Sequence, residues 1–235
     1  MSILLNKNTN ILVQGITGSE GSFHAEQMME YGSKVVCGVT PGKGGHTATI
    51  NKLPVFNSID EAKKEFQIDA TVIFVPPRFA AKAIIEAIKA NVELIVCISE
   101  GIPVRDMVTV KNMLDKSSST LIGPNCPGLI TAEESKIGIT PGFICKKGSV
   151  GILSRSGTLT YEAIDQVVNV GLGITTAVGI GGDPVIGSSM IDILKHFQND
   201  DDTKGIVMIG EIGGNMENDA ARWVKENLNL SLIHI

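Results

Sequence analysis

The chain contains 235 residues, of which 43% are hydrophobic and 19% charged, and its formal net charge at pH 7 is −5. This length is enough for two domains with buried cores. The acidic balance argues against a general nucleic-acid surface or an anionic membrane surface. No apolar run approaches the roughly 18 residues of a membrane span, and no secretory signal is recognised at the start. We therefore expect neither nucleic acid nor membrane as a partner.

The first half of the chain alternates short apolar runs with segments of helical periodicity. Apolar residues recur at Ala81, Ile84, Ile85 and Ile88, a spacing that is typical of one helix face. Strands are predicted at residues 11–13, 34–39, 71–75, 93–98 and 121–122. This alternation predicts an α/β fold in which helices cover both faces of a parallel sheet.

The alternation of strand and helix patterns stops at residues 131–148. This segment contains glycine, lysine and proline, and we interpret it as a connector. A second series of alternating elements follows, with strands predicted at 150–153, 175–180 and 205–209. The second unit, 149–235, is therefore predicted to be another doubly wound parallel sheet, but one shorter than such domains usually are.

A glycine turn joins the first predicted strand to the first predicted helix. Gly15, Gly18 and Gly21 follow the spacing G-x-x-G-x-x-G, which differs from the G-x-G-x-x-G fingerprint of dinucleotide sites. Small residues at a helix start allow a phosphate to approach free backbone N–H groups. The alternative is a tight turn that serves only packing.

The end of the second strand tests whether the ligand is NAD. An acid that binds the ribose is expected there, but residues 39–45 read VTPGKGG and contain none. Lys43 in this glycine loop suits a further phosphate, which favours a phosphorylated adenosine ligand such as coenzyme A over NAD. The alternative for Lys43 is an exposed loop charge.

A second candidate anion site follows the strand at 150–153. Ser156, Gly157 and Thr158 form a hydroxyl-glycine-hydroxyl turn at a helix start, where backbone N–H groups lie at the positive end of the helix dipole. The four cysteines, by contrast, are widely spaced and three of them lie in or just after apolar runs. Buried thiols are therefore expected, with no metal site.

The chain resembles the alpha subunits of succinate–CoA ligase (succinyl-CoA synthetase) over residues 1 to about 229. The resemblance rests on the motifs VTPGKGG (39–45), SEGIP (99–103), GPNCPG (123–128), SRSGTLTYE (154–162), GIGGDP (179–184) and GEIGG (210–214). It implies a Rossmann-like CoA-binding domain (1–130), a connector (131–148) and an incomplete flavodoxin-like ligase domain (149–235).

The resemblance also implies the reaction, the cofactors and the partner. Members of this family join succinate and CoA at the expense of a nucleoside triphosphate, in the tricarboxylic acid cycle, through a phosphorylated histidine. The ATP/ADP or GTP/GDP and Mg²⁺ belong to a beta subunit with an ATP-grasp site. The location it implies is cytoplasmic, or the mitochondrial matrix in a eukaryote, although no transit peptide is seen.

Site residues are carried over by their positions in the motifs. The residues implied for CoA are Thr17, Gly18, Ser19, Glu20, Lys43, Ile98, Ser99 and Glu100. Ser156, Gly157 and Thr158 are implied to hold the phosphoryl group, and Glu211 to orient the phosphohistidine. Tyr161 is implied to lie at the substrate and subunit boundary. Asn125 and Cys126, in the GPNCPG motif, are implied to lie near the active site and receive no chemical role.

The sequence departs from the family pattern towards its end. The family's phosphorylated histidine lies in a Gly-His-Ala-Gly loop beyond GEIGG, and none of the four histidines, His24, His46, His196 and His234, lies in such a loop. We therefore expect this chain alone to be inactive. We interpret residues 230–235 as not native, because a common sequencing-library adapter translates to the same six residues. The alternative is a genuine terminal strand.

Three other functions remain open from the sequence. The first is an acyl-CoA ligase that acts on malate, citrate or acetate in place of succinate. The sequence does not distinguish these acids, because the residues that bind the acid are not recognisable in it. A non-catalytic CoA-binding module would need only the first domain. An NAD oxidoreductase is disfavoured because no acid follows the second strand.

Overall fold

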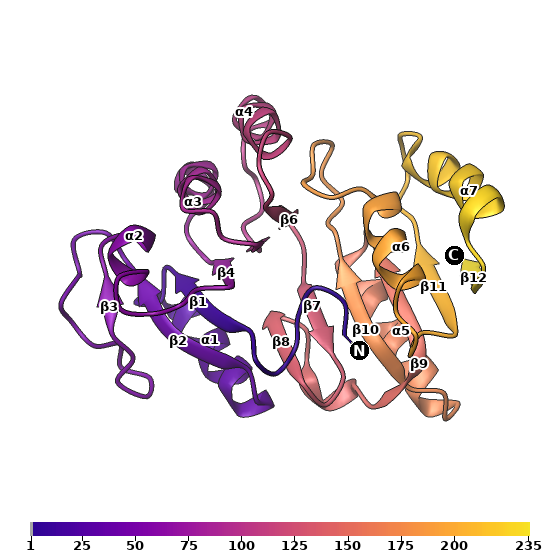
Figure 1. Ribbon diagram of the computed structural model, residues 1–235, viewed down its shortest axis with the longest axis horizontal. Helices are drawn as coiled ribbons and strands as arrows, with labels where there is room; N and C mark the ends of the chain where they lie inside the picture. Colours follow the sequence, from indigo (N-terminus) through magenta and orange to yellow (C-terminus); the bar gives the residue numbers. More distant parts are fainter. Residues whose placement is uncertain (1) are drawn as a thin grey trace.

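The computed structural model describes residues 2–235 and contains two six-stranded sheets that lie side by side (Figure 1). The first sheet is parallel throughout, with the order β3-β2-β1-β4-β5-β6. Its strands are β1 (Asn10–Gln14), β2 (Lys34–Val39), β3 (Val55–Phe56), β4 (Ala70–Ile73), β5 (Leu94–Cys97) and β6 (Thr120–Ile122). This is the strand order of dinucleotide-binding folds, and it confirms the Rossmann-like first sheet.

Helices cover both faces of the first sheet because its strands are apolar on both sides. Ile11 and Val13 of β1 belong to the core cluster that includes helix α1 (Ser19–Tyr31). Leu12 belongs to the cluster on the opposite face. That face is covered by α2 (Ile59–Ala62), α3 (Pro77–Lys89) and α4 (Val104–Leu114). The sequence analysis did not predict β3 and α2, which are too short to give a periodic signal.

The second sheet has the order β12-β11-β9-β10-β7-β8. Four of its strands are parallel: β9 (Lys147–Ser154), β10 (Ile174–Gly179), β11 (Gly205–Ile209) and β12 (Ser231–His234). In chain order they lie as 2-1-3-4, which is the flavodoxin-like arrangement. Helix α5 (Gly157–Asn169) covers one face, and α6 (Met190–Gln198) and α7 (Met216–Asn227) cover the other.

Part of the predicted connector, residues 131–148, lies in the second sheet. Strands β7 (Gly128–Thr131) and β8 (Ser135–Gly138) form an antiparallel hairpin at the edge of β10, followed by a short 3-10 helix (Gly142–Ile144). The second sheet is therefore mixed rather than purely parallel. The hairpin escaped prediction because each strand has four residues, although Ile130 and Ile137 are fully buried.

Residues 231–234 form the parallel edge strand β12, which pairs with β11. Of the two interpretations of the tail, this arrangement agrees with the strand. Whether residues 230–235 belong to the natural protein is a separate question and stays a prediction.

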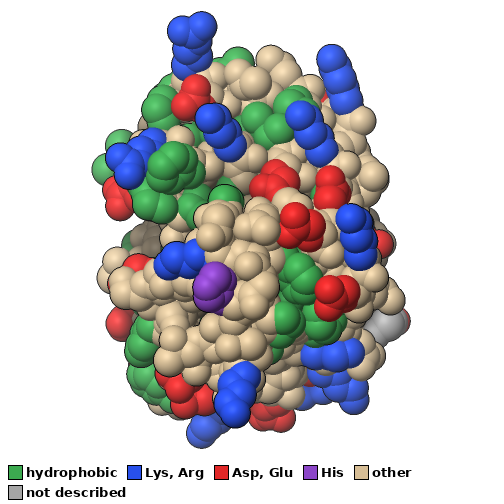
Figure 2. All heavy atoms as spheres, turned by 90° about the vertical axis from the view of Figure 1, so that its left-hand side faces the viewer, with side chains coloured by type: hydrophobic (Ala, Val, Ile, Leu, Met, Phe, Trp, Pro, Cys, Tyr) green, Lys and Arg blue, Asp and Glu red, His purple; other side chains and the backbone are tan. Residues whose placement is uncertain are grey.

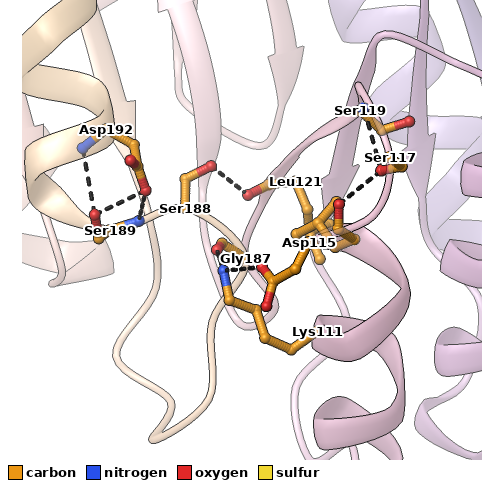
Figure 3. Close-up of polar contacts among 10 residues, drawn as sticks. Lys111, Asp115, Ser117, Ser119, Leu121, Gly187, Ser188, Ser189 and Asp192 are labelled. Atoms are coloured by element: carbon orange, nitrogen blue, oxygen red, sulfur yellow. Dashed lines mark hydrogen bonds and ion pairs between the residues drawn. The ribbon is translucent and has the colours of Figure 1, made fainter.

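The two sheets are joined by a shared core and by hydrogen bonds. One apolar cluster contains residues of α1, β7, β9, β10 and α6. Figure 3 shows the polar contacts between α4, β6 and the segment before α6. Lys111 Nζ donates to the Gly187 carbonyl at 2.8 Å, and Ser188 Oγ donates to the Leu121 carbonyl at 2.9 Å. These contacts fix the segment that leads from β10 into α6.

The cysteines and the surface agree with the composition. Cys37, Cys97, Cys126 and Cys145 are buried free thiols, as predicted. Basic and acidic side chains are interspersed over the face that Figure 2 shows, which is the side of the first domain. Among residues 2–235, no helix has both the length and the apolar character needed to cross a membrane.

Candidate functional site

Each sheet carries a cavity at the carboxyl ends of its strands, beside the point where the strand order reverses. In the first sheet this point lies between β1 and β4, and the cavity there measures about 530 Å³. In the second sheet it lies between β9 and β11, and the cavity measures about 610 Å³. Ligands of doubly wound sheets bind in such crevices.

The first cavity combines the predicted glycine turn with an apolar wall. Its lining includes Gly15, Thr17 and Gly18 from the turn and Val39, Phe74, Val75, Pro76 and Phe79 from neighbouring strand ends. Gly18 is the N-cap of α1 and supplies no side-chain cap, so the first N–H groups of α1 have no side-chain acceptor from this position. An anion has access to those donors.

The glycines of this turn are required by close backbone contacts. Gly15 has φ +86°, a left-handed conformation that favours glycine. A Cβ at Gly21 would lie 2.3 Å from the Gly15 carbonyl oxygen, closer than any real contact. Gly21 therefore lets α1 begin directly against the end of β1.

The structure brings Lys43 to the same turn. Lys43 Nζ donates to Thr17 Oγ1 at 3.2 Å, and Thr17 Oγ1 donates to Thr40 Oγ1 at 3.2 Å. Asn57 holds the Lys43 loop, because its Oδ1 accepts the N–H groups of Gly42 and Gly44 at 2.9 and 3.0 Å. Asn57 was not predicted from the sequence, because it lies outside every motif and reaches the loop only through the tertiary fold.

The other residues implied for CoA lie at the margin of this cavity or outside it. Ser19 is exposed, and the Glu20 side chain is 75% exposed and lies 3.7 Å from His24 Nε2. Burial of His24 outweighs the attraction of Glu20 and lowers the histidine pKa. Ile98, Ser99 and Glu100 follow β5 and do not line the cavity, although Ser99 Oγ donates to the Val75 carbonyl at 2.6 Å.

The second candidate site begins at the amino terminus of α5. Ser156 is its N-cap, and Ser156 Oγ accepts the N–H of Leu159 at 3.3 Å. Gly157 and Thr158 are exposed, and a Cβ at Gly157 would meet no atom within 4 Å. The Leu159 N–H is therefore capped by Ser156, whereas the open space beside Gly157 leaves room for an anion at this helix start.

An ion pair between the buried Arg155 and the partly buried Glu217, which was not predicted from the sequence, lies beside this helix start. The Arg155 side chain is 7% exposed, and its Nη1 lies 2.7 Å from Glu217 Oε1. The same oxygen accepts the backbone N–H of Glu211 at 3.0 Å. The only sequence signal was an arginine directly after a buried strand within the SRSGTLTYE motif. Its partner lies 62 residues away, so no local pattern reveals the pair.

The second cavity is lined by residues from all three neighbouring strand ends. They include Arg155 after β9, Gly182 and Asp183 after β10, and Gly213 and Gly214 after β11. The lining contains neither Glu211 nor Ser156–Thr158, which lie beside it in the chain. The Glu211 side chain is exposed, and its Cγ lies 3.9 Å from where a Gly182 Cβ would be.

A hydrogen-bonded bridge links the two cavities. Asn125 Nδ2 donates to Asp183 Oδ1 at 2.9 Å, and the Asn125 N–H donates to the Ser99 carbonyl at 3.1 Å. Because Ser99 also bonds Val75, the chain of contacts runs from a lining residue of the first cavity to one of the second. A Cβ at Gly181 would lie 2.2 Å from the Pro124 carbonyl oxygen, so glycine permits this close approach.

Cys126 and Tyr161 lie close to this bridge. Cys126 Sγ donates to the Cys97 carbonyl at 3.3 Å, and burial raises the pKa of the Cys126 thiol far above its ordinary value. Burial therefore favours the neutral thiol, which donates this hydrogen bond. Tyr161 is half-buried on α5, and burial, together with the nearby Cys126, raises its pKa.

None of the four histidines lies in helix α5 or at its start. His24 stacks on Phe74, His46 is exposed in the Lys43 loop and His196 lies in α6. His234 lies in β12, with its Nε2 3.1 Å from where a Gly210 Cβ would be. We assign His234 no role.

Comparison with known proteins assigns the two halves to known domains. Residues 6–101 match the family model described as a CoA binding domain, and residues 153–232 match that described as CoA-ligase. The alpha subunit of the ADP-forming succinate–CoA ligase of Staphylococcus epidermidis is 56% identical over 233 residues, which is 99% of this chain and 76% of that protein. The chain belongs to the succinate–CoA ligase alpha-subunit family.

A second relative supports this assignment, and two solved structures share the fold. The corresponding subunit of Staphylococcus aureus strain Mu50 is also 56% identical, with the same coverage. ATP citrate lyase from Methanothrix soehngenii, in complex with citrate and coenzyme A, superposes with a TM-score of 0.89 at 26% identity. That match covers 99% of this chain but 41% of the lyase chain.

An acetyl-coenzyme A synthetase of Ca. Korarchaeum cryptofilum, in complex with phosphate and ADP, shares the fold. Its TM-score is 0.77 at 22% identity, and the match covers 96% of this chain and 50% of that one. The predictions of the family, the α/β fold class and a CoA-binding subunit of a CoA ligase are thus confirmed.

Proposed function

We propose that this chain acts as the alpha subunit of an enzyme that joins succinate to CoA at the expense of ATP or GTP. One observation carries the proposal. Two cavities at strand-order reversals, one beside an uncapped helix start and one beside an open helix start, are joined by the Asn125–Asp183 bridge. A thiol donor and a phosphoryl or acyl group need such adjoining sites.

Coenzyme A is proposed to occupy the first cavity. The uncapped start of α1 suits a phosphate, and Lys43 adds a positive charge beside Thr17. Gly18 leaves the backbone N–H groups accessible, and the apolar wall of Val39, Phe74 and Val75 suits the less polar part of the ligand. When bound, CoA supplies the thiol that becomes the thioester. Ser19, Glu20, Ile98, Ser99 and Glu100 are proposed to act at the margin of this site.

The helix start at Ser156–Thr158 is proposed to hold the phosphoryl group. Free N–H groups at the positive end of α5 stabilise negative charge where it develops, without reorganisation during the reaction. Glu211 is proposed to orient the histidine that carries phosphate in this family, and Tyr161 to lie at the boundary with substrate and partner. That histidine loop does not occur among these 235 residues.

The partner is proposed to be a beta subunit with an ATP-grasp fold that binds the nucleotide and Mg²⁺. Membership in an alpha-subunit family supports a partner of this kind. The staphylococcal relatives support a cytoplasmic location, which is likewise part of the proposal.

Titration calorimetry of this chain with CoA and with NAD⁺ tests the first cavity. We expect CoA to bind, NAD⁺ to bind much more weakly, and Lys43→Met to weaken CoA binding selectively. Equal affinity for NAD⁺ would contradict the assignment of the cavity. The ligase activity is tested in the whole subunit co-purified with its beta subunit, by nucleotide-dependent thioester formation from succinate and CoA.

Another acyl-CoA ligase is the second candidate. The likeness to an ATP citrate lyase bound to citrate and coenzyme A favours it specifically. The same assay with malate, citrate or acetate in place of succinate distinguishes the substrates. CoA binding without any nucleotide-dependent phosphorylation of the assembled subunit would instead indicate a non-catalytic CoA-binding module.

A further inference from the structure

The loop after β11 is held by very few contacts of its own. Its residues 211–214 are exposed, Ile212 is 99% exposed, and Gly213 and Gly214 have φ values of +102° and +81°. A glycine-containing loop without buried side chains has a high conformational entropy, so something else must fix its shape.

Two hydrogen bonds from the Arg155–Glu217 pair to the loop, and one within the pair, supply that constraint. Glu217 Oε1 accepts the Glu211 N–H at 3.0 Å and also accepts from Arg155 Nη1 at 2.7 Å. Arg155 Nη1 in turn donates to the Gly213 carbonyl at 3.3 Å. The pair is therefore hydrogen-bonded to the first and third residues of the loop, Glu211 and Gly213.

The surrounding residues are adapted to this arrangement. A Cβ at Gly210 would lie 2.9 Å from Glu217 Cγ, so glycine makes room for the carboxylate to reach the Glu211 N–H. The Arg155 N–H donates to the Ile209 carbonyl at 3.0 Å, which ties the base of the arginine to the end of β11. Both ends of the pair are thus anchored on elements that frame the second cavity.

The carboxylate of Glu217 remains charged in this setting. Burial by itself would raise the pKa of Glu217, but hydrogen bonds from the Glu211 N–H and from Arg155 outweigh it and hold the pKa below its ordinary value. A charge-assisted hydrogen bond is stronger than a neutral one, so the ionised form holds the Glu211 N–H more firmly.

We propose that Arg155 and Glu217 are positioning residues that hold the Glu211–Gly214 loop at the mouth of the second cavity, and so set the place from which Glu211 acts. Neither residue needs to touch the transferred group. The position of the loop is inferred from its contacts alone, whereas its part in phosphoryl transfer rests on the proposed function.

Solvent exchange of the Glu211 amide, measured by NMR on this chain, tests the loop geometry. Glu217→Ala is expected to speed exchange about tenfold because the acceptor is lost, and Glu217→Gln to restore most of the protection because an amide oxygen still accepts. Asp219→Ala is the matched control, since it removes another acid from the first turn of α7 that does not bond Glu211. Unchanged exchange in a folded Glu217→Ala protein would overturn the proposal.

A second measurement tests the catalytic part in the whole subunit assembled with its beta subunit. Glu217→Ala is expected to slow nucleotide-dependent phosphorylation of the subunit about tenfold, with unchanged affinity for CoA and with rescue by Glu217→Gln. Combined with Glu211→Gln, the two effects should not multiply, because one residue acts through the other.

The outcomes separate the two proposals. Multiplying effects in the double variant, or an equal loss of CoA affinity, would mean that Glu217 acts as a general structural residue. If the wild-type assembly is not phosphorylated at all, the proposed function fails, while the amide exchange still decides whether the pair positions the loop.

Discussion

The first cavity and the second cavity occupy equivalent places in two doubly wound sheets, but they are stabilised differently. At the first, the turn is fixed by backbone contacts between neighbours in sequence, such as the close approach of Gly21 to Gly15. At the second, the loops are held by Arg155 and Glu217, which are 62 residues apart. The turn of the first site is therefore fixed locally in the sequence, whereas the loop of the second site depends on the completed fold.

The glycines make the same contrast. Gly21 has no room for a side chain, whereas the space around Gly157 is open. Glycine in a phosphate-type turn thus serves one of two physical purposes. At one position it allows close packing of the backbone, and at the other it leaves the backbone accessible to a ligand. The motif alone does not distinguish them.

The largest expected effect on stability is at the second cavity. Arg155→Met leaves the Glu217 carboxylate, whose side chain is 16% exposed, without its cation, and we expect a loss of about 3 kcal/mol in the free energy of unfolding. Urea denaturation measures this loss. The double variant Arg155→Met/Glu217→Leu should recover most of it, because no unpaired charge remains. If Lys43→Met proved equally destabilising, the contrast between the two cavities would be lost.

A substitution in the first turn should act on packing and on the ligand together. Gly21→Ala forces the Gly15 carbonyl and the start of α1 apart, so we expect a cost of about 2 kcal/mol and CoA affinity lowered about tenfold or more. Gly157→Ala is the matched control and should change the free energy of unfolding by less than about 0.5 kcal/mol. Equal costs at both positions would contradict the packing argument.

A moderate effect is expected from charge at the first cavity. Lys43→Met removes the ammonium group that bonds Thr17, and we expect the Kd for CoA to rise about tenfold at low salt. The difference between variant and wild type should shrink as the salt concentration rises, because salt screens an exposed charge. Calorimetric titrations of both proteins with CoA at two ionic strengths measure this difference in Kd. A difference that does not depend on salt would indicate that Lys43 shapes the loop instead.

The smallest effect is a dependence of stability on pH. Burial of His24 lowers its pKa below the ordinary value of 6.5, so the unfolded state binds the proton more readily than the folded state. The histidine's contribution is therefore fully present above about pH 6.5 and is lost as the pH falls below it. Melting temperatures at several pH values should show a shallower decline for His24→Gln. His46→Gln, at an exposed loop position, is the control, and an equal flattening there would refute the assignment.

The sequence by itself determined the helices and strands that are long and regularly periodic. Most strands of both sheets followed from apolar runs, and the buried face of α3 followed from the spacing of residues such as Ala81, Ile84 and Ile88. Glycine turns at strand ends likewise located both helix starts. These features depend on neighbours within about one turn or one strand, where periodicity and turn chemistry act directly.

Only the tertiary structure decided the rest. It placed the hairpin of residues 128–138 on the second sheet, because the burial of Ile130 and Ile137 comes from β10 and its neighbours and not from their own short strands. It brought Asn57 to the Lys43 loop, Asn125 to Asp183, and Arg155 to Glu217. A hydrogen bond or ion pair between residues far apart in the chain leaves no periodic trace, since its geometry exists only after the elements between them have packed.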